Sequence, residues 1–252
     1  MDASAPMLMT KEQIKTAAQV ESVTIPSPGE FFAAMDKQGQ PNWTQLFQPV
    51  QPGSTSSRAQ MALMLGVLVA DGYIAVQAQD GQGVKNTGRE IINLAKKLNV
   101  SQSILGRGNS ISDFATNNDW SALREELEAT QNEVKLAMAE QQDQNLVSLV
   151  TLGAWIRGTS VASGFVSKNY APAMADLLRQ PAIISDLLAR INALPEAMLT
   201  TPPIDSLGRG LEKSEKIVSP APSTPLSQES VNDLNAIMSG MVTSIMEGEK
   251  NP

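Results

Sequence analysis

Asp71 and Arg157 are the residues whose surroundings most suggest chemistry, because each is the only charged residue in a long apolar run. Asp71 lies in the run from residue 61 to 78, and Arg157 lies in the run from 148 to 166. A charge in an apolar core is costly unless an opposite charge neutralises it. We therefore expect the two side chains to be in contact. Such a pair forms either the floor of a polar pocket that recognises a ligand or a structural ion pair. The remaining alternative is that the two charges are separate and reach solvent at helix ends.

Small residues recur at four-residue spacing in both apolar runs. This spacing places small side chains on one helix face, where they let two backbones approach closely. A glycine inside a helix costs about 0.5–1 kcal/mol relative to alanine, so glycines kept there need a packing reason. We therefore predict that helices over residues 57–79 and 144–168 cross at the centre of the fold. The small residues concerned are Ala62, Gly66, Ala70, Ala154, Gly158, Ser160 and Gly164.

The chain contains neither histidine nor cysteine, and these absences exclude a wide range of chemistry. Histidine is the commonest general base, and cysteine provides disulfides, thiolate nucleophiles and thiolate metal ligands. Hydrolases that use a histidine-dependent triad, zinc peptidases and zinc deaminases are therefore excluded. Carboxylates remain, because the chain has 26 Asp and Glu residues, and two of them can act as general acid and base. A carboxylate-dependent enzyme of the lyase or glycosidase type is therefore an open alternative, although the sequence does not locate the pair.

No motif predicts a metal ion or a cofactor. Asp71, Asp80 and Asp143 carry oxygen atoms suited to Ca²⁺ or Mg²⁺, but their spacing is not that of an EF-hand. The segment from residue 80 to 85 holds two glycines but follows a predicted helix rather than a strand. It therefore indicates a turn between helices and not a phosphate-binding loop.

The composition predicts an all-α protein. Aromatic residues make up only 4% of the chain, whereas apolar residues make up 42% and include 12 methionines. The abundant Leu and Ala have high helix propensity, and the alternating pattern of strands is almost absent. We expect a multi-helix bundle with two central apolar helices, an N-terminal helical arm and a docked C-terminal helix. The net charge of −7 argues against nucleic acid and anionic membrane surfaces as partners, because both require clusters of Lys and Arg.

We expect four parts in chain order. Residues 1–55 form the N-terminal helical arm, and residues 56–200 form the central helical bundle. Residues 201–226 are rich in proline and are expected to form a linker or a segment that wraps the surface. Residues 227–252 contain an amphipathic helix and a tail.

Local signals predict where several helices begin and end. Thr10 and Ser27 each stand three residues before a Gln or Glu, which fits a capping box and predicts helices over 11–22 and 28–38. The segment 101–109 holds two glycines, and we expect a turn followed by a flexible break there.

The C-terminal helix, expected over residues 228–246, is the candidate element for binding a partner. One face is apolar and rich in methionine, which is typical of a helix that binds in a groove. The alternatives are that the helix packs on its own bundle, or that two copies of the chain exchange it in a homodimer. The candidate partner-binding residues are Leu234, Met238, Met241 and Ile245.

Both apolar runs approach the length of a membrane span. Each, however, has its charge near the middle, where an Asp or Arg costs about 2.5–3.5 kcal/mol in the bilayer. Neither run has basic flanks or an aromatic belt. We therefore predict buried core helices rather than membrane spans, with a membrane-inserting protein that has a soluble form as a further alternative.

The first residues are rich in Ala, Ser and Pro and resemble the start of a mature exported protein after removal of a signal peptide. We therefore expect a periplasmic or otherwise exported protein, with a cytoplasmic one as the alternative. The expected function is that of a non-enzymatic binding or scaffold protein of the cell envelope. It would act through helical surfaces or an apolar, Met-lined cleft, on a protein partner or a small apolar ligand.

Overall fold

Helices and their connections make up the whole of the described chain, which confirms the predicted all-α, multi-helix fold. The computed structural model describes residues 25–219 and 224–247, without the side chains of residues 101–105. The elements are α2 (Pro28–Gly39), α3 (Trp43–Leu46), α4 (Arg58–Gln77), α5 (Gly81–Lys97), α6 (Ser101–Asn117), α7 (Trp120–Glu140), α8 (Gln144–Lys168), α9 (Pro172–Ala175), the 3₁₀ turn η1 (Asp176–Leu178), α10 (Pro181–Asn192), α11 (Glu196–Leu199), α12 (Pro202–Val218) and α13 (Gln228–Met246).

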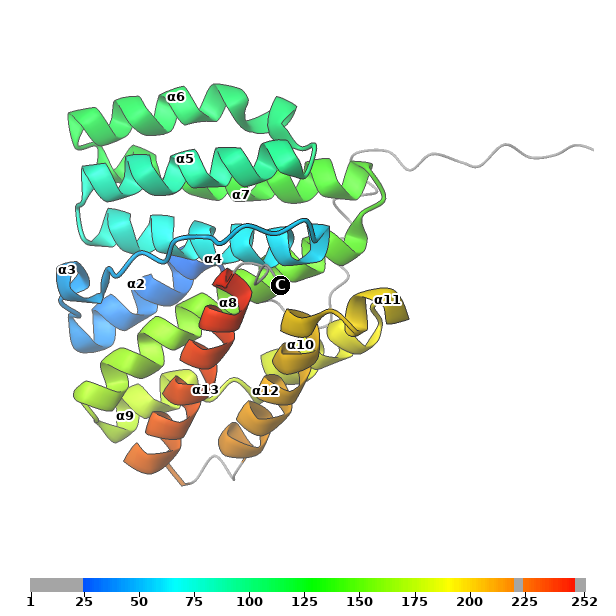
Figure 1. Ribbon diagram of the computed structural model, residues 1–252. Helices are drawn as coiled ribbons and strands as arrows, with labels where there is room; N and C mark the ends of the chain where they lie inside the picture. Colours follow the sequence, from blue (N-terminus) through cyan, green and yellow to red (C-terminus); the bar gives the residue numbers. More distant parts are fainter. Residues whose placement is uncertain (1–24, 220–223, 248–252) are drawn as a thin grey trace, which may run out of the picture.

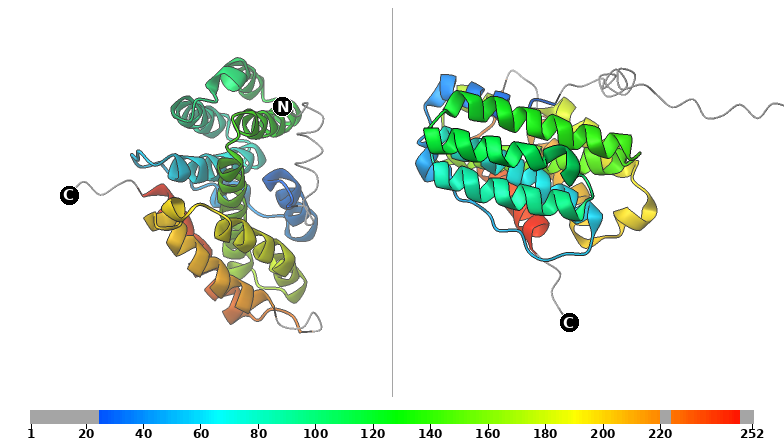
Figure 2. Two further views of the ribbon diagram at one scale, coloured as in Figure 1. Left: turned by 90° about the vertical axis from the view of Figure 1, so that its right-hand side faces the viewer. Right: turned by 90° about the horizontal axis from the view of Figure 1, so that it is seen from above.

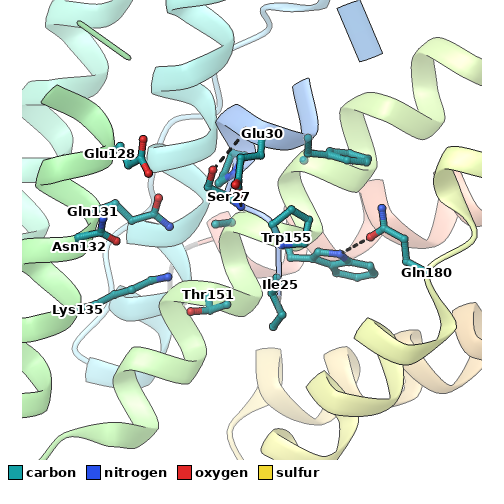
Figure 3. A pocket seen from close by; sticks show the side chains of 15 residues that line it. Ile25, Ser27, Glu30, Glu128, Gln131, Asn132, Lys135, Thr151, Trp155 and Gln180 are labelled. Carbon is teal, nitrogen blue, oxygen red and sulfur yellow. Dashed lines mark hydrogen bonds between the residues drawn. The ribbon is translucent and has the colours of Figure 1, made fainter. Parts of the chain in front are cut away.

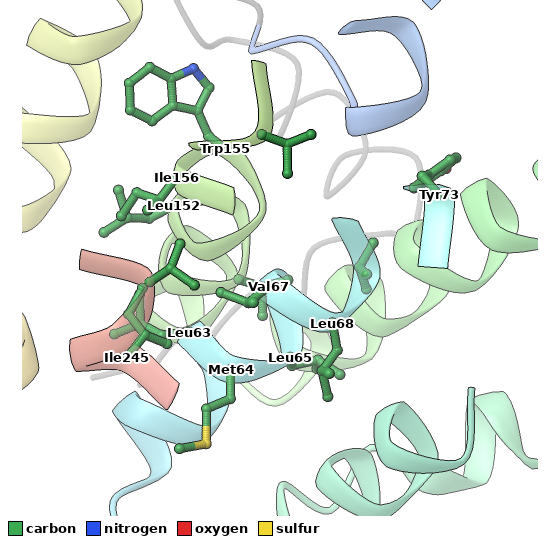
Figure 4. Close-up of a cluster of buried hydrophobic side chains, with 14 of the residues drawn as sticks. Leu63, Met64, Leu65, Val67, Leu68, Tyr73, Leu152, Trp155, Ile156 and Ile245 are labelled. Carbon is green, nitrogen blue, oxygen red and sulfur yellow. The ribbon is translucent and has the colours of Figure 1, made fainter. Parts of the chain in front are cut away.

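Helices α4 and α8 form the centre of the molecule, as the sequence predicts. They make the most extensive helix–helix contact in the described structure, and nearly every side chain of α4 is buried. Helices α5, α6 and α7 stack on one side of this pair, and α10, α12 and α13 lie on the other (Figures 1 and 2). The core between these layers is built mainly from Leu, Ile, Val and Met (Figure 4).

Two glycines allow α4 and α8 to touch backbone to backbone. A Cβ atom at Gly66 would overlap the carbonyl oxygen of Val150, and one at Gly153 would overlap the carbonyl oxygen of Leu63. The sequence spacing identifies Gly66 but misses Gly153.

Two other glycines of α8 pack against helices other than α4. Gly158 lies against Phe31 and Phe32 of α2, and Gly164 lies against Asn235 of α13. The small residues of α8 therefore face three helices rather than α4 alone, because a central helix is contacted from all sides.

Capping residues fix several helix starts. Ser27 and Glu30 form the predicted capping box of α2, in which the Ser27 hydroxyl accepts from the Glu30 amide and the Glu30 carboxylate accepts from the Ser27 amide. The side chains of Asp80 and Asp119 accept backbone hydrogen bonds at the starts of α5 and α7. The helix predicted over 11–22 lies outside the described residues.

Two segments differ from the prediction. Residues 101–117 form one continuous helix, α6, in place of a turn and a flexible break. A reason lies in α7, where Glu126 and Glu133 both form ion pairs with Arg107 of α6 and hold this part of the helix in place.

The proline-rich segment forms helix α12 over most of the length for which a linker was expected. Pro202 and Pro203 occupy its first turn, where the missing N–H groups have no helical partner in any case. The buried residues Ile204, Leu207 and Leu211 then follow at helical spacing.

Helix α13 packs on α8 and α12 of its own chain. The four candidate partner-binding residues, Leu234, Met238, Met241 and Ile245, are all buried there. The structure therefore places them in the core, and they present no surface to a partner in this conformation.

Helices α4 and α8 are long and apolar enough to cross a membrane by length and composition. Their most apolar windows are 100% and 83% buried inside the protein, as expected for the core helices of a bundle.

Candidate functional site

Asp71 and Arg157 form the predicted buried ion pair between α4 and α8. The Nε atom of Arg157 donates to Oδ1 of Asp71 over 2.6 Å, and the two residues are 8% and 1% exposed. The pair also binds the segment that leads from α3 to α4. Arg157 Nη2 donates to the carbonyl oxygen of Gln48 over 2.8 Å, and the amide of Val50 donates to Asp71 Oδ2 over 3.2 Å.

These contacts make the pair a structural clamp. Asp71 also lines a cavity of about 240 Å³ beside α5, but Arg157 neutralises its charge by direct contact. Burial raises the pKa of Asp71, while the Arg157 guanidinium and the Val50 amide oppose that rise. The pair joins α4, α8 and the segment between α3 and α4, and the direct contact of the two charges leaves neither of them to a charged ligand.

A different cleft carries the polar groups suited to a ligand. It lies between the segment that enters α2, helix α7 and helix α8, and its volume is about 200 Å³ (Figure 3). Its lining includes the polar or charged residues Ser27, Glu30, Glu128, Gln131, Asn132, Lys135, Thr151 and Gln180, together with the aromatic residues Phe31 and Trp155. None of the described lining residues is a methionine, in contrast to the apolar, Met-lined cleft expected from the sequence.

Gln131 is the most informative residue of this cleft. It is only 4% exposed, and α7 directs its side chain toward the cleft (Figure 3). Within the part of the chain that the structure describes, its amide makes no hydrogen bond. Its amide is therefore left to bind a ligand or water that enters the cleft, since an amide offers both a donor and an acceptor.

Trp155 forms the aromatic wall of the cleft. Its indole Nε1 donates to Oε1 of Gln180 over 3.0 Å, and Gln180 Nε2 donates in turn to the carbonyl oxygen of Leu177. The indole is therefore fixed in position before any ligand arrives. A rigid aromatic face beside amide groups is suited to a small molecule with both polar and apolar surfaces.

Two carboxylates, Glu30 and Glu128, lie at this cleft from opposite helices (Figure 3). Both side chains are exposed, and one oxygen of Glu30 is engaged by the Ser27 amide. Their charges reach the buried phenol of Tyr73: burial raises its pKa well above the ordinary value, and Glu128 and Glu30 raise it further.

The sequence does not predict this cleft, because its lining residues come from four separated segments and follow no motif. Gln131 belongs to a helix whose acidic and amide residues look like an ordinary solvated face. The one usable signal is that Gln131 occupies an inward position of α7, in register with Leu127 and Val134.

No group of His, Cys, Asp and Glu side chains within the described residues could hold a metal ion. The oxygen-bearing residues Asp71, Asp80 and Asp143 have separate roles. Asp71 binds Arg157, Asp80 caps α5, and Asp143 pairs with Arg58.

Comparison with protein-family models, with curated proteins and with solved structures finds no match to this chain. The function must therefore be inferred from the residues that line its clefts and cavities.

Proposed function

We propose that this chain is a non-enzymatic binding protein whose cleft between α2, α7 and α8 takes a small polar molecule. The supporting observation is the Gln131 amide, which faces the cleft from a side chain that is only 4% exposed and has no hydrogen-bond partner among the described residues. A ligand that both donates to and accepts from this amide would supply the two hydrogen-bond partners that the chain does not.

The size and walls of the cleft narrow the ligand class. Its volume of about 200 Å³ is below the roughly 300–1,000 Å³ of sites for drug-sized molecules. Trp155 and Phe31 offer apolar contact, whereas Gln131, Asn132 and Thr151 offer amide and hydroxyl groups. These groups favour a small neutral molecule with several hydroxyl or amide groups over a purely apolar one.

The test uses the Trp155 indole N–H, which is a nuclear magnetic resonance reporter inside the cleft. Pooled small molecules from a cell extract are expected to shift the Trp155 indole signal and to leave that of Trp120 in place. Replacing Gln131→Leu keeps the side-chain size but removes the amide, and it should abolish the shift. The matched control is Gln38→Leu at an exposed position of α2, which should leave the shift intact. An extract that never moves the Trp155 signal would contradict the proposal.

A carboxylate-dependent enzyme is the second candidate, because Glu30 and Glu128 share the cleft. A general acid is normally tuned by burial, however, and these two side chains are exposed. The binding proposal predicts that Glu30→Gln and Glu128→Gln keep the Trp155 response to ligand. Bond cleavage by the wild-type protein that disappears in both variants would favour the enzyme instead.

The proposed exported location, in the periplasm or elsewhere outside the cytoplasm, is supported only by the sequence features described above. Fractionation of cells that express the full-length gene tests it directly. The proposal predicts recovery in the extracytoplasmic fraction, whereas recovery with cytoplasmic markers would contradict it.

A further inference from the structure

A second cavity, of about 230 Å³, lies where α2, the end of α4 and the start of α7 meet. It is distinct from the Gln131 cleft and shares no lining residue with it. Its described lining consists of Gly29, Ala33, Asp36, Tyr73, Gln77 and Arg124. One anion and one cation therefore line the same small space.

Hydrogen bonds hold both charged groups in place. Trp43 Nε1 donates to Asp36 Oδ1, and Gln77 Nε2 donates to Asp36 Oδ2, each over 2.6 Å. On the other side of the same amide, Gln77 Oε1 accepts from Arg124 Nε over 3.2 Å and from Arg124 Nη2 over 2.8 Å. The Gln77 amide thus stands between the carboxylate and the guanidinium.

Neither charge is neutralised by an ion pair within the described residues. Among those residues, Asp36 accepts one hydrogen bond at each oxygen, from the neutral indole and amide groups, and Arg124 donates only to the Gln77 carbonyl oxygen. Each carboxylate oxygen can accept a second hydrogen bond. This arrangement differs from that of Asp71 and Arg157, which contact each other directly. The guanidinium uses Nε and Nη2 for Gln77, so Nη1 remains available for another acceptor.

The remaining walls are apolar or weakly polar. The ring of Tyr73 forms one wall beside Ala33 and Gly29. The Tyr73 hydroxyl is buried and has no hydrogen-bond partner among the described residues. The cavity therefore combines two fixed opposite charges with an apolar surface large enough for a short side chain.

We propose that this cavity binds a zwitterion of the α-amino acid type, with its ammonium group at Asp36 and its carboxylate at Arg124. The Gln77 amide already bridges Asp36 and Arg124, with its nitrogen as donor and its oxygen as acceptor. In an α-amino acid, the ammonium nitrogen and a carboxylate oxygen are separated by one more covalent bond than the nitrogen and oxygen of an amide. A simple anion would be repelled by Asp36, and a simple cation would be repelled by Arg124. Only a ligand that carries both charges satisfies both ends.

The test compares three probes of matched shape: L-valine, isovalerate, which lacks the amino group, and isobutylamine, which lacks the carboxylate. Because Trp43 donates to Asp36, its indole N–H signal reports on this cavity. L-Valine at millimolar concentration is expected to shift the Trp43 signal, and each of the other two probes should bind at least about tenfold more weakly. Equal shifts from all three probes, or no shift with L-valine, would overturn the proposal.

Variants separate the two charges. Arg124→Gln and Asp36→Asn should each weaken L-valine binding by at least about tenfold. Arg124 is exposed, so its variant is expected to fold, and unchanged backbone signals would verify this. The matched control is Arg209→Gln, at an exposed arginine of α12, which should bind L-valine like the wild type. Wild-type affinity in Arg124→Gln would refute the assignment of the carboxylate.

This proposal stands apart from the Gln131 cleft. Trp43 reports on the zwitterion cavity and Trp155 on the cleft, so one spectrum records both. A shift of Trp155 alone under L-valine counts against the zwitterion cavity while leaving the cleft proposal in place.

Discussion

At the scale of single residues, pairs of opposite charges occur in two arrangements. Asp71 and Arg157 neutralise each other in the core, and the atoms around them complete their hydrogen bonds. Asp36 and Arg124 are held near each other but apart, with the Gln77 amide between them. The first arrangement fixes the fold, and the second leaves two charges available to a ligand.

The clamp role of Asp71 gives a direct stability prediction. Asp71→Asn keeps the side-chain size but leaves the buried Arg157 charge unpaired, so the free energy of unfolding should fall by about 3–5 kcal/mol. Chemical denaturation followed by circular dichroism measures this change. Asp143→Asn breaks the more exposed pair with Arg58 and serves as the control, with an expected loss of about 0–1 kcal/mol. Equal losses of unfolding free energy in the two variants would show that the buried Arg157 charge does not need Asp71 as its partner.

At the scale of elements, the contact between α4 and α8 depends on the absence of side chains at two positions. Gly66 and Gly153 lie directly against backbone atoms of the opposite helix, which cannot move aside as a flexible side chain can. The low helix propensity of glycine is therefore offset by closer packing of two long apolar helices.

Gly66→Ala should lower the free energy of unfolding by about 3 kcal/mol, because the added methyl group overlaps the Val150 carbonyl oxygen and forces the helices apart. Gly240→Ala is the matched control in α13, where a Cβ atom meets nothing within 4 Å. That change should raise stability by about 0.5–1 kcal/mol, since alanine favours the helix. Thermal unfolding of the two variants gives the comparison, and a tolerated Gly66→Ala would mean that the helices can separate at little cost.

The elements also show which sequence signals are dependable. The apolar runs and the Ser27 capping box predict α4, α8 and the start of α2, because burial and capping act within one helix. Proline and glycine content misleads at α12 and α6. Pro202 and Pro203 lie in the first turn of α12, which tolerates proline. Arg107 of α6 forms ion pairs with α7, and the local sequence pattern around Arg107 does not reveal these contacts.

At the scale of the whole molecule, the candidate sites lie between elements that are distant in sequence. The Gln131 cleft needs α2, α7 and α8 together, and the zwitterion cavity needs α2, α4 and α7. No spacing rule relates these helices, so a single sequence predicts neither site. The Asp71–Arg157 pair is the exception, because a lone charge in each of two apolar runs indicates its own partner.

The layered arrangement also predicts an uneven distribution of stability. Helices α4 and α8 are enclosed by neighbours on all sides, whereas α6 packs chiefly on α5 and α7 at the outer edge (Figure 1). Within residues 106–117 only Ile111 and Ala115 are buried. Little apolar surface would be exposed if α6 detached, so it should open well before the core does.

Native-state amide hydrogen exchange measures this difference. Amides of α4 and α8 should exchange only through global unfolding, and amides in the middle of α6 should open with a free energy lower by about 2 kcal/mol or more. Helix α13 provides the control, because it is also an outer helix but buries seven residues against α8 and α12. It should be protected like the core. Uniform protection across α4, α6 and α13 would instead mean that the outer layer unfolds only together with the central pair.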